Sequence, residues 1–245
     1  MCGRYKIERS PEELRAFFDF EEHPNFPPRY NIAPTQPVPI VRLVAGKRHF
    51  QLVRWGLVPS WMKEMPKSVL INARAETIDE KPSFRGGFRH RRCLIPTDGF
   101  YEWQAREGRP KQPHLIQRSD GAPFAMAGIW DDWMSADGSE LETCAVVTTA
   151  ANDRLSPVHH RMPVILDPKD WDAWLDNKGT SAKEAAELLR PAPDDVMEAV
   201  PVGPRVNKIS HDDAGLTQIV DPDADQAIPD SSKQAPPEDD QLSLL

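Results

Sequence analysis

Proline is the residue that most constrains this chain, because it fixes the backbone φ angle and lacks the N–H group that helix interiors and central strands require. The sequence contains 25 prolines in 245 residues, about twice the usual share. Many lie between Pro24 and Pro39, where they exclude a long helix. The fold is therefore expected to consist of short extended segments joined by ordered loops.

Short runs rich in β-branched or apolar residues, each bounded by Gly, Pro or Asp, predict strands. They span 38–44, 50–58, 92–96, 123–130, 143–149 and 162–166. Ser10 followed by Pro11 and two glutamates is typical of a helix start, and 168–175 and 181–189 have further helical patterns. The sequence predicts one mainly β, α+β domain over residues 2–217, with a few peripheral helices.

The negative charge of the chain is concentrated at its end. The net charge is −8, but 221–245 hold seven acids against Lys233, which leaves −2 for the rest. This polar, Pro-rich composition predicts a disordered acidic tail over 220–245. The stretch from Lys47 to Arg92 contains eleven Lys or Arg residues but only four acids. This excess can neutralise nucleic-acid phosphates if the fold brings it onto one face, and is otherwise a solvated basic surface.

The cysteine pattern and the absence of targeting signals limit where the protein works. Cys2, Cys93 and Cys144 are few, odd in number and far apart, which predicts reduced thiols rather than a disulfide framework or a metal site. We expect no metal and no cofactor. The sequence shows neither a signal peptide nor an apolar run long enough to cross a bilayer. A cytoplasmic protein is expected.

Cys2 is chemically the most suggestive residue. A residue this small at position 2 favours removal of Met1, which gives Cys2 a free α-amine. Such an amine has a pKa near 7.7–8.0, so roughly a tenth of it is neutral and nucleophilic at pH 7. After imine formation with an aldehyde, the thiol can close a five-membered thiazolidine ring. The alternative is that Cys2 is a small residue at an arbitrary start.

Five further segments accompany the initial Met-Cys-Gly-Arg-Tyr. They are Asn-Ile-Ala-Pro-Thr at 31–35, Trp-Gly-Leu-Val-Pro-Ser-Trp at 55–61, Asn-Ala-Arg-Ala-Glu-Thr at 72–77, Pro-Thr-Asp-Gly-Phe-Tyr-Glu-Trp at 96–103 and His-His-Arg-Met-Pro at 159–163. In this order, from Cys2 to about Asn207, the chain resembles the SRAP family, the SOS response-associated peptidases. The resemblance implies a β-barrel core and a nucleoid-associated DNA repair protein. Its target would be abasic sites in single-stranded DNA, joined through a thiazolidine to Cys2.

The resemblance also implies an active site in which Asn72, Glu102 and His159 surround Cys2. Glu102 would act as the acid and base of imine formation and ring opening. Asn72 would hold the amine or a sugar hydroxyl, and His159 would exchange protons with the sugar O4′. Without the motifs, each of these three residues would be assigned a structural role.

DNA contacts are expected from arginines for phosphates and from flat apolar side chains for unstacked bases. The candidates are Arg4, Arg74 and Arg161 for phosphates, Pro34, Trp61 and Met62 as a wedge beside the lesion, Trp103 beside the carboxylate, and Thr148. Many family members have an aromatic residue where this chain has Met62. For the tryptophans, core packing is the alternative.

Two other functions suit the same residues. In a cysteine peptidase or amidase, the Cys2 thiol would attack an acyl carbon with His159 or the α-amine as base. In a noncovalent adaptor, the domain would only bind single strands. A lyase step and peptidase-like removal of Met1 by the protein itself are left open.

The tail ends in Gln-Leu-Ser-Leu-Leu. These residues resemble the short peptides by which bacterial repair proteins dock on the sliding clamp, with Leu245 where Phe is more usual. The residues expected to bind are Gln241, Leu242, Leu244 and Leu245. The alternative is an unstructured end with incidental leucines.

Overall fold

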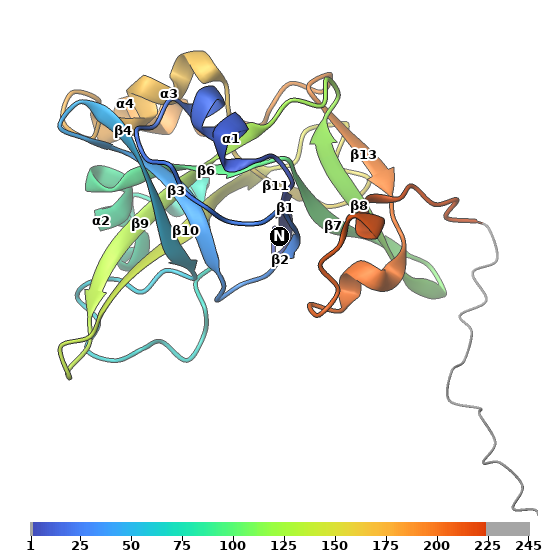
Figure 1. Cartoon of the computed structure of the whole chain (residues 1–245), viewed down its shortest axis with the longest axis horizontal. Coiled ribbons are helices and arrows are strands. Elements are labelled where there is room, and N and C mark those ends of the chain that lie inside the picture. Colours follow the sequence, from blue (N-terminus) through green and yellow to red (C-terminus); the bar gives the residue numbers. More distant parts are fainter. Residues whose placement is uncertain (1, 224–245) are drawn as a thin grey trace, which may run out of the picture.

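Strands dominate the computed structural model of the chain, which describes residues 2–223 (Figure 1). The strands are β1 Tyr5–Ile7, β2 Arg29–Ile32, β3 Pro37–Val44, β4 Lys47–Trp55, β5 Asn72–Arg74, β6 Arg92–Thr97, β7 Gly99–Arg106, β8 Arg109–Arg118, β9 Phe124–Met134, β10 Glu140–Ala150, β11 Arg161–Pro163, β12 Ile165–Leu166 and β13 Met197–Pro201. The α-helices are α1 Pro11–Phe18, α2 Pro82–His90, α3 Trp171–Leu175 and α4 Ala182–Glu187. Short 3-10 turns are η1 Ala75–Thr77, η2 Pro168–Asp170, η3 Pro204–Asn207 and η4 Ala214–Thr217.

Five strands close into a barrel. The hydrogen-bonded order β10-β4-β3-β6-β9 returns to β10, because β9 also pairs with β10. Only the β10–β4 pairing in this ring is parallel. β5 and β11 add to β10 outside the ring, and β12 adds to β9. Because the ring is closed, none of its strands is left with an unpaired edge. Many short strands can therefore form a stable sheet.

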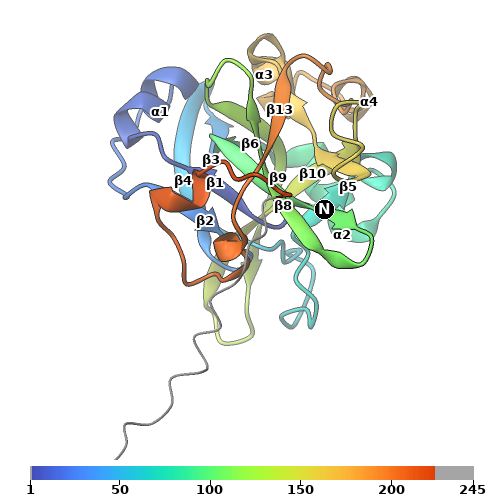
Figure 2. The ribbon, with the colours of Figure 1, turned by 90° about the vertical axis from the view of Figure 1, so that its right-hand side faces the viewer.

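A second sheet, in the order β13-β8-β7-β1-β2, lies beside the barrel. Figure 1 shows β7, β8 and β13 to the right of the barrel strands, and Figure 2 shows β8 and β13 on the near side. Tyr5 of β1 packs edge-on against Trp55 at the end of β4, with ring centroids 5.3 Å apart. Side chains of both sheets join one main hydrophobic core. The predicted mainly β single domain with a barrel core is confirmed.

The predicted helix starts follow from local capping. Ser10 Oγ accepts from the Glu13 N–H at 3.2 Å, and Glu13 Oε2 accepts from the Ser10 N–H at 2.8 Å. This reciprocal capping box opens α1, whose Leu14 and Phe18 are buried. The predicted helix over 168–175 is divided into η2 and α3, and Ser181 caps α4.

Helix α2 and six strands have no counterpart in the sequence-based expectation. The strands are β1, β2, β5, β7, β8 and β13. In α2, Gly86 and Gly87 weaken the helical pattern. A Cβ on Gly87 would lie 3.3 Å from Ile129 Cβ and from the Trp130 carbonyl oxygen. The close approach of α2 to β9 therefore explains why position 87 is a glycine.

Several of the eleven cations between Lys47 and Arg92 are paired with acids or buried. Lys47, Arg48, Arg89 and Arg91 form ion pairs with acids. Arg92 is fully buried in β6. Its guanidinium donates to four carbonyl oxygens, those of Phe88 (3.0 Å), Trp174 (2.6 Å), Asp176 (2.8 Å) and Thr180 (3.0 Å). This last cation of the basic stretch therefore joins β6 to α2 and α3.

The first residues of the predicted tail lie against the folded part. The Val220 N–H donates to the Pro201 carbonyl oxygen at 3.0 Å, and Asp223 pairs with Arg106 at 2.8 Å. The rest of the tail lies outside the described residues. Within 2–223, no helix has the length and apolar character needed to cross a membrane.

Arg92→Met is expected to lower the free energy of unfolding by about 3 kcal/mol or more, because two buried and two part-buried carbonyl oxygens lose their donor. The measurement is urea unfolding followed by circular dichroism. Arg85→Met, on the exposed side of α2, is the matched control and should change stability by less than about 0.5 kcal/mol. Equal stabilities of the two variants would contradict the structural role of Arg92.

Candidate functional site

The N-terminal segment lies where the two sheets meet. Cys2 is fully buried in the main core. β1 follows and pairs with β7 in the second sheet, where the Tyr101 N–H donates to the Arg4 carbonyl oxygen at 2.9 Å. Asn72, which opens β5 beside the barrel strand β10, donates through Nδ2 to the Cys2 carbonyl oxygen at 2.9 Å. Cys2 is therefore held from both sheets.

Asn72 also has a hydrogen-bonding atom to spare. Its Oδ1 is buried and accepts no hydrogen bond from the described residues. A buried amide oxygen without a donor costs free energy, so it is ready to accept from an incoming hydroxyl or amine. The position of Asn72 suits the predicted role of holding the nucleophile or the opened sugar.

Glu102 supplies a carboxyl group to the same place. It lies on β7 and is 3% exposed. Burial raises the pKa of this carboxyl group, so it keeps its proton to a higher pH than an exposed glutamate. Antiparallel pairing puts Tyr5 opposite Phe100, and the Tyr101 N–H donates to the Arg4 carbonyl oxygen, so β7 runs past β1 toward Cys2 at Glu102. The Glu102 charge contributes to the raised pKa of the Cys2 thiol after the larger effect of burial.

The Cys2 thiol is therefore the protonated form at neutral pH. Burial raises its pKa above the usual value, and the negative charge of Glu102 raises it further. Reactive cysteine nucleophiles have the opposite property, a pKa lowered by nearby positive charge. This environment favours a nucleophile other than the thiolate for the first bond-forming step.

His159 precedes β11 and is half-buried. Its Nδ1 lies 3.0 Å from the Arg161 backbone nitrogen and 3.2 Å from the Arg161 carbonyl oxygen, so it can accept from the first or donate to the second. Burial lowers the pKa of the imidazole, so the ring is neutral at pH 7. The charge of Lys111 contributes to the pKa of both His159 and Glu102, although burial is the larger effect on each.

Three of the predicted DNA-binding residues lie together at the β5-β10-β11 edge. Arg74 pairs in register with Thr148, and Arg161 pairs with Ala150 two residues further along β10. The Arg161 Nη2 donates to the Thr148 carbonyl oxygen at 2.7 Å. Arg161 also pairs with Glu76 of η1, an acid that sequence reasoning did not assign to the site.

Arg4 and Trp103 both contact the segment 206–211, which also packs against β2. The Arg4 Nη1 donates to Asn31 Oδ1 and to the Val206 carbonyl oxygen, both at 2.8 Å. The Trp103 Nε1 donates to Asn207 Oδ1 at 2.7 Å. Asn31, in the first internal motif, also donates to carbonyls of this segment. Arg4 and Trp103 thus have structural contacts beside the DNA roles expected for them.

The predicted wedge residues differ in exposure. Trp61 is 61% exposed, so core packing does not explain it. Its Nε1 donates to the Pro82 carbonyl oxygen at 3.3 Å. Met62 and Pro34 are half-buried, and the Met62 carbonyl oxygen accepts from Trp133 Nε1 at 2.7 Å. The loop is anchored at Met62 and presents the Trp61 ring to solvent.

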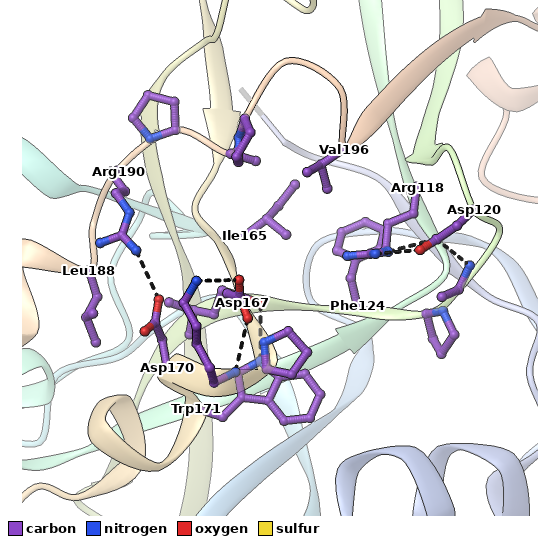
Figure 3. Close-up of a pocket in the computed structure, with 18 of the residues that line it drawn as sticks. Arg118, Asp120, Phe124, Ile165, Asp167, Asp170, Trp171, Leu188, Arg190 and Val196 are labelled. Carbon is purple, nitrogen blue, oxygen red and sulfur yellow. Dashed lines mark hydrogen bonds and ion pairs between the residues drawn. The ribbon is translucent and has the colours of Figure 1, made fainter.

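A cavity of about 500 Å³ lies elsewhere, between β8, β12 and α3 (Figure 3). Arg118–Asp120, Lys169–Asp167 and Arg190–Asp170 pairs lie on its rim. None of the candidate site residues lines it. Among residues 2–223, no three His, Cys, Asp or Glu side chains are grouped to hold a metal ion.

Comparison with known proteins agrees with the arrangement of the motifs. The family model for "SOS response associated peptidase (SRAP)" matches residues 1–209. "Abasic site processing protein YoaM" of Bacillus subtilis (strain 168) is 37% identical over 220 residues, which cover 88% of this chain and 97% of the relative. "Abasic site processing protein YedK" of Escherichia coli (strain K12) is 33% identical, covering 90% of this chain and 100% of the relative.

The fold is also similar to that of an experimentally solved protein. A Bacteroides thetaiotaomicron protein superimposes with a TM-score of 0.81 and 28% identity, covering 89% of this chain and 100% of that one. The family match spans Cys2, Asn72, Glu102 and His159. This chain therefore belongs to the SOS response associated peptidase (SRAP) family.

Proposed function

We propose that this chain processes abasic sites in single-stranded DNA by bonding covalently to the aldehyde of the lesion through Cys2. The observation that supports this most directly is the buried carboxyl group of Glu102 beside an N-terminal cysteine whose thiol is protonated. The names of the relatives, abasic site processing proteins, point to the same substrate.

The first bond forms between nitrogen and carbon. After Met1 is removed, the Cys2 α-amine attacks the C1′ aldehyde and gives a carbinolamine. Glu102 donates a proton to the departing hydroxyl, so that one water leaves and an imine remains. The Cys2 sulfur then adds to the imine carbon, and its proton passes to the nitrogen. The product is a thiazolidine formed with the net loss of one water.

Opening of the sugar must precede this attack, because the closed ring has no free aldehyde. When its Nδ1 accepts from the Arg161 N–H, neutral His159 has its proton on Nε2 and can donate it to O4′ as the C1′–O4′ bond breaks. Asn72 Oδ1, which lacks a donor among the described residues, can accept from the sugar hydroxyl or from the amine. Each group is neutral, which suits a buried site.

The competing cysteine peptidase or amidase would need a thiolate. Burial and the Glu102 charge raise the pKa of the Cys2 thiol, which disfavours that form. The raised pKa suits the ring-closing step, in which the thiol brings its own proton to the nitrogen. If the protein were a noncovalent adaptor, the grouping of Cys2, Asn72 and Glu102 would have no function.

Two accompanying reactions depend on the same imine and the same terminus. Removal of the proton next to the imine carbon would eliminate the 3′ phosphate and break the strand, with Glu102 or His159 as base. Ring closure by the thiol consumes the imine, so it competes with this lyase step. Met1 removal is required for every step, whether the protein or another enzyme performs it.

The DNA strand would follow the edge formed by Arg74, Thr148 and Arg161 toward Cys2. Guanidinium groups bind phosphates, which position the strand without reading its sequence. The exposed Trp61 would stack on a base beside the lesion, with Pro34 and Met62 next to it, and Trp103 and Arg4 would border the reacting sugar.

Cys2→Ala is expected to abolish the crosslink to an abasic oligonucleotide that survives boiling in SDS, because the ring-closing sulfur is lost while the amine remains. Cys2→Ser, which keeps the shape of the side chain, should also fail. Borohydride should restore a covalent band in both variants by reducing the imine. An undiminished boiling-stable band in Cys2→Ala without borohydride would contradict the mechanism.

Glu102→Gln is expected to slow crosslinking by about 100-fold or more, because the side chain keeps its shape but cannot deliver a proton. Binding to an oligonucleotide carrying a non-reactive tetrahydrofuran site should change little. The two quantities are measured by single-turnover gel kinetics and fluorescence anisotropy. An equal loss of rate and affinity would instead assign Glu102 a structural role.

The end of the chain is the basis of a separate proposal, recruitment to the bacterial sliding clamp. Gln241, Leu242, Leu244 and Leu245 lie outside the described residues, and their sequence alone supports the idea. A short apolar peptide after an acidic tether can enter a hydrophobic groove at modest affinity. Such docking would leave the domain able to reach nearby single strands.

The full chain is expected to bind purified clamp saturably, and a variant with Gln241, Leu242 and Leu244 changed to Ala is expected to lose this binding. The measurement is isothermal titration calorimetry, with heats compared at equal protein concentration. Both proteins should crosslink an abasic oligonucleotide equally well, which controls for folding. Identical, nonsaturating titrations would end the clamp proposal.

A further inference from the structure

Glu76 pairs with Arg161, one of the arginines expected to bind DNA. It is 50% exposed on η1, and both of its carboxylate oxygens contact the Arg161 guanidinium, Oε1 through Nη1 and Oε2 through Nη2 at 3.0 Å. Hydrogen bonding to Arg161 lowers the pKa of Glu76, and the charge of Arg74 also contributes. The acid is therefore ionised at neutral pH and within the field of both cations.

The contact with Glu76 occupies Nη1 and Nη2 of Arg161, the two guanidinium nitrogens that a phosphate would also bind. Arg161 is only 11% exposed, and Nη2 is further held by the carbonyl and hydroxyl oxygens of Thr148. Its Nε is buried and has no acceptor among residues 2–223. A two-oxygen anion fits this fork well, and carboxylate and phosphate are the two anions that arginine binds in this way.

We propose that the Glu76 carboxylate occupies the phosphate position of Arg161 in the free protein and is displaced when single-stranded DNA binds. Glu76 is thus a residue that limits affinity for undamaged strands. This inference rests on the proposed contact between Arg161 and DNA.

The physical reason is an exchange of one ion pair for another. Without Glu76, Arg161 would meet a phosphate as an unneutralised cation and gain the full attraction. With Glu76, the phosphate must replace a carboxylate that already holds the fork, so the net gain is smaller. Weak binding to intact strands matters little to a protein that is held at a lesion by a covalent bond. Glu76 would therefore raise the preference for damaged over intact DNA.

The test is the affinity of the full-length protein for an intact oligo-dT strand, measured by fluorescence anisotropy over a range of salt concentrations. Glu76→Gln should bind about three- to tenfold more tightly than wild type at low salt. The gain should shrink as salt rises, because screening weakens the freed charge. Glu80→Gln is the matched control, since Glu80 is an exposed acid nearby that forms no ion pair within the described chain.

Arg161→Gln, alone and combined with Glu76→Gln, completes a double-mutant cycle. Arg161→Gln should weaken binding, and on that background Glu76→Gln should have no further effect. Thermal unfolding by circular dichroism verifies that each variant is folded, and Arg161→Met, which also removes the charge, replaces Arg161→Gln if the latter is not.

Three results would overturn the inference. Glu76→Gln binding as weakly as wild type, or more weakly, would make Glu76 a positioning residue for Arg161 or a bystander. A gain that persists with Arg161→Gln, or that Glu80→Gln reproduces, would reduce it to a general charge effect. Unchanged affinity in Arg161→Gln would instead remove the Arg161–DNA contact on which the inference rests, whereas abasic crosslinking would test the covalent function separately.

Discussion

The hydrogen bond from Asn72 to the Cys2 carbonyl oxygen is the contact on which the site depends. Asn72 belongs to a strand added to the barrel, whereas β1, just after Cys2, pairs with the second sheet. Cys2 is therefore fixed at the junction of the two sheets, which Glu102 of β7 also borders. Residues near a chain terminus are usually among the most mobile parts of a protein. The burial of Cys2 provides the fixed geometry that the proposed bond formation requires.

Burial also determines which form of each reacting group is present. It raises the pKa of the Cys2 thiol and of the Glu102 carboxyl group, and it lowers the pKa of His159. All three shifts favour the neutral form, because a desolvated charge is costly. Two of the arginines expected to bind DNA, Arg74 and Arg161, lie outside this centre, at the β5-β10-β11 edge. The site thus combines a desolvated centre with a charged edge that, in the proposed function, would position the strand.

Local signals in the sequence predicted part of the fold, and the motifs predicted the centre of the site. Ser10 and Pro11 are sufficient to begin α1, because capping involves neighbours in the chain. The pairing of Glu76 with Arg161 was not predictable, since it joins residues 85 positions apart through strand register. The same holds for Asn31, which holds a segment about 175 residues away. The sequence also did not predict that several of the eleven cations between Lys47 and Arg92 pair with acids or, in the case of Arg92, are buried.

The most direct test of the account is the mass and location of the adduct with an abasic oligonucleotide. Intact mass spectrometry should give the sum of the oligonucleotide and the chain without Met1, less one water. After protease and nuclease digestion, the sugar remnant should be on the N-terminal peptide, with both the amine and the thiol of Cys2 blocked. A remnant on a lysine, or a Cys2 thiol that still reacts with iodoacetamide in the adduct, would contradict the thiazolidine mechanism.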